Sequence, residues 1–347
     1  MNKTRFVLTL WAGVGSVAAA GAANPPNVLI VVADDLSAYD VARYGVSSDP
    51  VHMPVLDRLA DRGVTFTNAW SNPVCSPTRA CIQTGRHAFR TGVGFLVLPN
   101  TKALDPSEWI LPELLGQATP QSYRSGAFGK WHLGNQTVGG FSAPNRAGYD
   151  VFAGNMTSLV DNQETYSAWM KVTNGSPKPA QKYNTTDIVD DAIRWLSSAP
   201  EPWFCYVAFN APHVPLHAPP AHLHSVDLTT APPPAFAPRP YFKAMVEAMD
   251  TEMGRLVASL GDRVDHTNIV FIGDNGSPKE AVVPPVLPHQ AKISFYEAGI
   301  RVPLVVAGPA VRVKGSASDA LVHAVDVFPT VAEMAGVDPA AVLPPGT

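Results

Sequence analysis

The chain has 347 residues, of which 46% are hydrophobic and 16% charged, and its formal net charge at pH 7 is −4. This composition excludes a chain that is disordered throughout, and the length is ample for a large buried core. The slightly acidic balance also excludes the basic footprint of nucleic-acid-binding proteins, so no nucleic-acid partner is expected.

The first 23 residues are expected to form a secretory signal peptide. Lys3 and Arg5 precede an apolar run at residues 6–17, and small residues follow at 18–23. This order is typical of a segment that is removed on export. The apolar run is too short to span a bilayer, and no later stretch is apolar enough to do so. We therefore expect an exported protein, periplasmic or secreted, without a membrane span.

The first predicted strand is the continuous apolar run Asn27–Ala33. Such a run indicates a strand that is buried on both faces, as in parallel sheets. It ends directly before Asp34 and Asp35. A short helix is predicted next at residues 55–62, and Gly63 is expected to end it.

Another predicted helix begins near Cys75. Ser76 is a favoured helix cap, and Pro77 suits the first helical position. Cys75 would then lie near unpaired backbone N–H groups at the positive end of the helix dipole, which favours a thiolate or another anion. The alternative interpretation is an ordinary capped helix with a cysteine in front of it.

The remaining elements alternate between strands and helices. Strands are predicted at residues 125–128, 203–209, 269–272 and 302–306, and helices at 187–197, 241–260 and 326–334. This alternation predicts an α/β sheet with helices on both faces, in which ligands bind beyond the carboxyl ends of the strands. The polar groups that follow strands are Asp34 with Asp35, Lys130 with His132, His213, and Asp274 with Asn275. Their shared position predicts a single site at one edge of the sheet.

The acidic and amide members of this set suggest a metal site. Asp34, Asp35, Asp274 and Asn275 offer only hard oxygen ligands, which suit Ca²⁺ or Mg²⁺ rather than Zn²⁺. Taken singly, each pair has a simpler explanation. Asp35 could cap a helix, and the residues from Asp274 could form a plain turn.

Cationic and imidazole side chains would complete the site. Lys130, His132, His213 and Lys292 could hold a sulfate or phosphate group and carry protons. The alternative is that the lysines are merely solvated and the histidines structural. The position of Lys292 in the chain does not predict that it joins the site, because Lys292 comes before its nearest predicted strand and not after one.

The three cysteines, Cys75, Cys81 and Cys205, leave at least one thiol outside any intramolecular disulfide. If Cys81 paired with Cys205, Cys75 would be available for chemistry. Cys205 lies in an apolar run and could equally be a small core residue.

Several blocks of the sequence resemble the type I sulfatases. Cys75-Ser76-Pro77-Thr78-Arg79, followed by Thr84-Gly85-Arg86, is similar to the signature that carries the modified cysteine of that family. The blocks NVLIVVADDL, GKWHLG, FNAPHVPLHAP, IVFIGDNG, KISFYEAGIRVP and VDVFPTVAEMAGV resemble other family segments, in the family's order.

The resemblance implies an alkaline-phosphatase-like fold with a central, mostly parallel sheet and helices on both faces. Residues 24–347 would form the sulfatase catalytic domain. Family members continue into a smaller C-terminal domain with an antiparallel sheet, which this chain, ending at Thr347, is expected to lack as a truncated product or a fragment.

The resemblance also implies the chemistry at residue 75. A formylglycine-generating or sulfatase-maturating enzyme would convert Cys75 to formylglycine (3-oxoalanine), which is hydrated to a geminal diol. One hydroxyl attacks sulfur and the alcohol leaves, and the second hydroxyl expels sulfate and restores the aldehyde.

The family assigns roles to the other site residues as well. Ca²⁺, with Mg²⁺ as the alternative, would be bound by Asp34, Asp35, Asp274, Asn275 and the modified Cys75. Arg79 would steady the hydrated aldehyde, and Lys130 and Lys292 would hold the sulfate oxygens. His213 would protonate the leaving group, and His132 would lie near the diol.

The expected function is therefore hydrolysis of an aryl or carbohydrate sulfate ester to an alcohol and inorganic sulfate. A sulfated small molecule or glycan would be the substrate. One alternative is a phosphodiester or phosphonate monoester hydrolase of the same superfamily. The other is a truncated, inactive homologue that binds anions.

Overall fold

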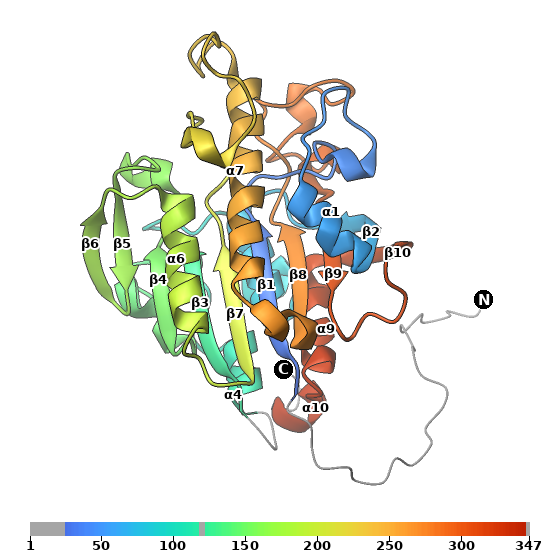
Figure 1. The fold of residues 1–347 in the computed structure, drawn as a ribbon. Coiled ribbons are helices and arrows are strands. Elements are labelled where there is room, and N and C mark those ends of the chain that lie inside the picture. The colour runs from blue at the N-terminus through green and yellow to red at the C-terminus, as the bar shows by residue number, and fades with distance from the viewer. Residues whose placement is uncertain (1–24, 118–121, 345–347) are drawn as a thin grey trace, which may run out of the picture.

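The computed structural model describes residues 25–117 and 122–344, so the expected signal peptide lies outside the described residues. Within these ranges ten strands form one sheet (Figure 1). In spatial order they are β10 (Ser316–His323), β2 (Gly63–Trp70), β9 (Leu304–Ala307), β8 (Thr267–Gly273), β1 (Asn27–Ala33), β7 (Trp203–Ala208), β3 (Arg124–Lys130), β4 (Val151–Asn155), β5 (Trp169–Thr173) and β6 (Ser176–Ala180).

The centre of the sheet is parallel and its flanks are mixed. The neighbouring strands β8, β1, β7, β3 and β4 all run in the same direction. On one flank, β9 runs antiparallel to both β8 and β2, and β10 pairs with β2 in parallel. On the other flank, β5 and β6 continue the sheet in antiparallel fashion. The prediction of a mostly parallel sheet is confirmed.

Helices cover both faces of the sheet, as predicted (Figure 1). One face packs against α1 (Pro54–Asp61), α6 (Asn184–Leu196) and α7 (Pro238–Ala258). The other packs against α2 (Cys75–Thr84), α4 (Leu111–Gly116) and α9 (Val327–Met334). The shorter helices are α3 (Ala88–Thr91), α5 (Ala143–Arg146), α8 (Glu297–Ile300) and α10 (Pro339–Val342), with 3₁₀ turns η1 (Ala42–Tyr44), η2 (Gly140–Ser142), η3 (Leu159–Asn162), η4 (Ala221–Leu223), η5 (Gly261–His266), η6 (Pro288–Gln290) and η7 (Ala324–Asp326).

The continuous apolar sequence of β1 follows from this sandwich of layers. Val28, Ile30 and Val32 join the core on the α2 face, whereas Leu29 and Val31 join the core on the α7 face. Side chains alternate between the faces of a strand, so a strand covered on both sides must be apolar throughout.

The two cores on opposite faces of the sheet hold different cysteines. Cys81 packs in the core on the α2 face and Cys205 in the core on the α7 face. All three cysteines are buried and unpaired. The sheet therefore separates Cys81 from Cys205, and Cys205 is the small core residue that one interpretation expected.

The predicted elements are all present, with ends that differ by a few residues, but five strands were not predicted. Strand β4 illustrates the reason. Gly129 in β3 and Gly154 in β4 lie so close that a Cβ on Gly154 would meet the Gly129 carbonyl oxygen at 1.9 Å. The contact requires glycine in a five-residue strand, and glycine weakens the sequence pattern of a strand. Across residues 25–117 and 122–344, none of the helices combines the length and the hydrophobicity that a membrane span needs.

Candidate active site

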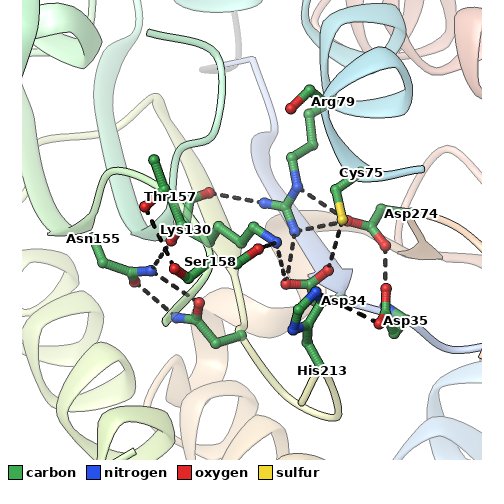
Figure 2. Close-up of polar contacts among 12 residues, drawn as sticks. Asp34, Asp35, Cys75, Arg79, Lys130, Asn155, Thr157, Ser158, His213 and Asp274 are labelled. Atoms are coloured by element: carbon green, nitrogen blue, oxygen red, sulfur yellow. Dashed lines mark hydrogen bonds and ion pairs between the residues drawn. The ribbon is translucent and has the colours of Figure 1, made fainter. Parts of the chain in front are cut away.

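The strand ends bring most of the predicted site residues together. Because β1, β8, β7 and β3 are parallel, their carboxyl ends lie at one edge of the sheet. Asp34 and Asp35 follow β1, Asp274 and Asn275 follow β8, Lys130 ends β3, and His213 follows β7. Figure 2 shows several of these side chains converging on one cluster with Cys75 and Arg79.

Cys75 and Lys292 reach this edge by different routes. Strand β9 is antiparallel to both β8 and β2, so β2 ends, and β9 begins, at the edge where β8 ends. Cys75 follows the end of β2, and Lys292 precedes β9. The Lys292 backbone N–H also donates to the carbonyl of Ser277, which lies just beyond β8, over 3.0 Å. The antiparallel strand therefore explains why a lysine before a strand joins residues that follow strands.

The start of α2 differs from the prediction. Cys75 is itself the first helical residue, and Val74 occupies the cap position without a side-chain hydrogen bond. Ser76 is not the cap, because it already lies in the first turn and its Oγ accepts a hydrogen bond from the Val97 N–H over 3.0 Å. The expectation for Ser76 and Pro77 was wrong, although Cys75 does lie in the first turn of the helix.

Cys75 is a thiol that is held in its neutral form. It is fully buried, and its Sγ donates to Asp34 Oδ1 over 3.3 Å. Burial, with the adjacent negative charge of Asp34, raises the thiol pKa well above its usual value. The expected preference for a thiolate was therefore wrong, because burial and the Asp34 charge outweigh the helix dipole.

Asp34 connects Cys75 to Lys130. The Lys130 ammonium donates to Asp34 Oδ2 over 2.6 Å and to Ser158 Oγ over 2.8 Å (Figure 2). Burial disfavours the Asp34 carboxylate, but Lys130 and the other nearby cations outweigh burial and hold its pKa well below its usual value. Asp34 is therefore an ionised acceptor in contact with residue 75.

Arg79 joins three structural elements. Its Nε and Nη2 donate to Asp274 Oδ2 over 3.0 and 2.9 Å, and its Nη1 donates to the Lys130 carbonyl over 2.8 Å. The side chains of Arg79 and Asp274 are both fully buried. Although burial opposes ionisation of the guanidinium, the Asp274 charge outweighs it and raises the pKa of Arg79. Arg79 thus connects α2 to the ends of β3 and β8.

Asp35 is the centre of a second set of contacts. The Lys292 ammonium lies 2.7 Å from Asp35 Oδ1 and 2.9 Å from Oδ2, and 3.7 Å from the Cys75 Sγ. The Asn275 amide donates to Asp35 Oδ1 over 2.7 Å. His213 Nε2 lies 3.7 Å from Asp35 Oδ2. Lys130 and Lys292 therefore place two ammonium groups beside the carboxylates that surround residue 75.

The two histidines of the site are both buried and differ in their contacts. His213 Nδ1 lies 2.8 Å from the Val214 carbonyl, so Nδ1 carries a proton and Nε2 faces the cluster. Burial lowers the pKa of His213 despite the charge of Asp35, and burial with Lys130 lowers that of His132 further. Neither ring nitrogen of His132 has a partner within the part of the chain that the structure describes. A buried imidazole without partners is suited to meet a ligand.

The donor set fits a hard divalent cation. Ligand atoms of Asp34, Asp35, Cys75 and His213 lie within 4.8 Å of one another. The Asn275 side-chain oxygen is buried and, among the described residues, accepts no hydrogen bond. Asp274 Oδ1 accepts the Asp35 backbone N–H over 3.1 Å and so lies beside the same group. Carboxylate and amide oxygens are the ligands that Ca²⁺ and Mg²⁺ prefer.

Backbone strain is concentrated at this edge of the sheet. Asp35, His132 and Ile293, which follows Lys292, have positive φ angles of 70°, 58° and 76°. Such a conformation costs of order 1–3 kcal/mol for a non-glycine residue and persists only where its surroundings impose it. Strained residues gather at functional sites, so their position here agrees with a built site.

The sequence did not reveal several residues that support the cluster. Ser158 holds Lys130, but it follows β4, the strand whose pattern glycine weakens. The Tyr166 hydroxyl lies 2.6 Å from the Asn210 carbonyl oxygen and 2.7 Å from that of His213, so it fixes the loop that carries His213. No local signal identifies Tyr166, because the contact spans 47 residues.

Comparisons with known proteins agree with this geometry. The family model described as Sulfatase matches residues 26–337. The chain is 29% identical over 376 aligned residues to N-acetylgalactosamine-6-sulfatase of Sus scrofa, an alignment that covers 97% of this chain and 67% of that protein. It is 26% identical to arylsulfatase J of Mus musculus, with 90% of this chain and 53% of that protein covered. The solved structure of Ps i-CgsB in complex with k-i-k-neocarrahexaose is similar, with a TM-score of 0.76, 28% identity, and 90% of this chain and 72% of that chain covered.

Proposed function

The chain belongs to the sulfatase family, and on that premise we propose that it hydrolyses a sulfate ester at residue 75 after Cys75 has been converted to formylglycine. One observation carries the proposal. The Cys75 Sγ lies 3.3 Å from a carboxylate oxygen of Asp34 and 3.7 Å from the Lys292 ammonium, inside a buried cluster of oxygen ligands and cations. That is a setting for an anionic ester and a nucleophile at position 75.

The neutral thiol supports the proposal that cysteine is only the precursor. A thiol whose pKa is raised by burial is a poor nucleophile. Formylglycine supplies, as its hydrate, one hydroxyl that attacks sulfur and a second that expels sulfate. Asp34 Oδ1 already accepts the proton of the Sγ at this position, so it is placed to accept a hydroxyl proton there. Arg79 holds the Asp274 side chain and the Lys130 backbone in place, because it donates hydrogen bonds to both.

Lys130 and Lys292 would bind the sulfate oxygens. Each ammonium now donates to a carboxylate of the cluster, and each has more than one N–H to share. Ser158 Oγ also accepts a hydrogen bond from the Lys130 ammonium and so helps to orient it. His132, whose nitrogens meet no described partner, would contact the hydrate or the ester.

His213 would deliver a proton to the leaving alcohol from Nε2, the nitrogen that faces the cluster. An anionic ester nearby favours the imidazolium form, which opposes the effect of burial on the pKa of His213. We expect His213→Ala to lower kcat about 10²-fold for an alkyl or sugar sulfate, whose alcohol leaves poorly. For a nitrophenyl sulfate, whose phenolate leaves without a proton, we expect a loss of less than about fivefold.

Steady-state kinetics of the two substrate types measures this difference. His222→Ala, which changes an exposed histidine outside the cluster, is the matched control. Equal losses on both ester types would contradict the assignment of His213 as the general acid.

Asp34, Asp35, Asp274 and Asn275, with residue 75, would hold Ca²⁺. The metal would supply positive charge that neutralises the sulfate group as it reacts. The unpartnered Asn275 oxygen and the set of oxygen donors support this assignment.

Calcium is expected to stabilise the folded protein. A cation that binds only the native state at 100 times its Kd adds about 2.7 kcal/mol to the free energy of unfolding. The melting temperature of chelator-treated protein should therefore rise as CaCl₂ is added. The rise should be smaller when MgCl₂ is added instead. Asn275→Ala should reduce the shift. A melting temperature that does not respond to either cation would contradict the metal site.

The activity is tested by offering purified protein a panel of esters. The panel contains monosulfated hexose regioisomers, an aryl sulfate, a phosphodiester and a phosphonate monoester. Release of inorganic sulfate supports the proposal. Turnover of the phosphorus esters alone would favour the superfamily alternative, and binding of sulfate esters without release, in protein with modified Cys75, would favour an inactive homologue. Export, and maturation of Cys75 by a formylglycine-generating enzyme, belong to the same proposal.

A further inference from the structure

A cavity of about 320 Å³ lies among the segments that follow β3 and β4, and it is not used by the chemistry described above. Its walls come from three segments, residues 97–99, residues 134–141, and the stretch from the end of β4 to β5. This volume lies within the range of sites that hold small ligands.

Each wall is joined, by a hydrogen bond or along the chain, to a close neighbour of a cluster residue. The Val97 N–H donates to Ser76 Oγ, and Ser76 is the neighbour of Cys75. Gly134, which begins the second wall, comes two residues after His132. Thr157, in the third wall, precedes Ser158, the partner of Lys130 (Figure 2). These connections place the cavity near the site where a sulfate group would bind, on a side where the rest of a substrate could extend.

The lining combines apolar and polar side chains. Phe141 and Met156 offer apolar surface, whereas Gln136 and Asn162 offer amides that can donate to and accept from hydroxyls. A sugar ring presents a face of C–H groups, which can pack on the apolar side chains, and a rim of hydroxyls, which can hydrogen-bond with the amides.

The charge of the lining is one-sided. Glu164 is the carboxylate among the lining residues, and none of those residues is a lysine or an arginine. Glu164 is partly buried, so its charge is only partly screened by solvent. A second sulfate or a carboxylate on the substrate would meet this carboxylate with no cation of the lining to compensate.

We propose that this cavity binds the alcohol part of the substrate, and that Glu164 selects an uncharged sugar carrying a single sulfate ester over sugars with a second anionic group. The proposal rests on the proposed function. Glu164 is then a specificity-determining residue that takes no part in the chemical step.

The test compares kcat/KM for a monosulfated hexose with kcat/KM for the same hexose carrying a second sulfate. The hexose is the regioisomer from the panel that is turned over fastest. Wild type should prefer the monosulfate. Glu164→Gln retains an oxygen acceptor without the charge. It should therefore reduce the preference about tenfold, mainly by raising kcat/KM for the disulfated hexose. Glu164→Lys should reverse the preference.

Glu333→Gln, which changes an exposed carboxylate of α9, is the control and should leave the ratio unchanged. Hydrolysis of the monosulfate with the same ratio in wild type and Glu164→Gln would overturn the cavity assignment alone. Protein that releases sulfate from no ester would overturn both this inference and the proposed function.

Discussion

Cys75→Ala is expected to lower kcat for sulfate-ester hydrolysis by at least about 10³-fold while leaving the fold intact. Alanine fills most of the space of a buried cysteine, so packing changes little. The substitution removes the hydrogen bonds of the Sγ with Asp34 and Lys292 and the ligand that residue 75 would offer to Ca²⁺. The variant lacks both the precursor of the aldehyde and the atom around which the cluster is arranged. Sulfate release, together with circular dichroism and the melting temperature, measures the two effects separately.

The matched control is Cys81→Ala, which removes a buried thiol from the same helix. Cys81 contacts Asn72 rather than the cluster, so its loss should change kcat by less than about threefold. If Cys75→Ala retained most of the sulfatase activity in folded protein, residue 75 would not be the nucleophile's precursor.

Arg79→Leu is expected to destabilise the protein by about 3–5 kcal/mol and to abolish activity. The guanidinium is fully buried against Asp274 and also lies 3.8 Å from Asp34 Oδ2. Its removal leaves buried carboxylate charge with less positive charge nearby. Removing one partner of a buried ion pair in this way lowers the free energy of unfolding strongly. The Lys130 carbonyl also loses its donor.

Urea unfolding measures the change in the free energy of unfolding. Arg312→Leu changes an exposed arginine and should shift that free energy by less than about 0.5 kcal/mol. Arg79→Lys should lower the free energy of unfolding by an amount between those for Arg79→Leu and Arg312→Leu. One ammonium cannot reproduce the contacts to Asp274 and the Lys130 carbonyl together. A loss of stability for Arg79→Leu no larger than for Arg312→Leu would contradict its part in the cluster.

The sequence predicted the parallel centre of the sheet because the physical signal there is strong. Strand β1 is covered on both faces, so its seven residues are all buried and nearly all apolar. The polar residues directly after such strands could be grouped into one site from sequence alone, since the carboxyl ends of parallel strands share an edge. The residues that share this position at or after the end of a strand are Asp34, Asp35, Lys130, His213, Asp274 and Asn275.

Other parts of the site depend on information that no local pattern carries. Lys292 reaches the cluster because β9 runs antiparallel to β8, and strand direction is a property of the whole sheet. Ser158 was missed because β4 carries a glycine that its contact with β3 requires. The state of the Cys75 thiol was predicted wrongly because its burial and its distance from Asp34 are tertiary facts.

The working group proposed at position 75 is an aldehyde made from the cysteine. Mass spectrometry of the peptide that carries residue 75, from active protein purified from its native host, detects this group. We expect the mass of formylglycine at position 75, in a fraction that rises with the specific activity of the preparation. An unmodified thiol at position 75 in fully active protein would contradict it.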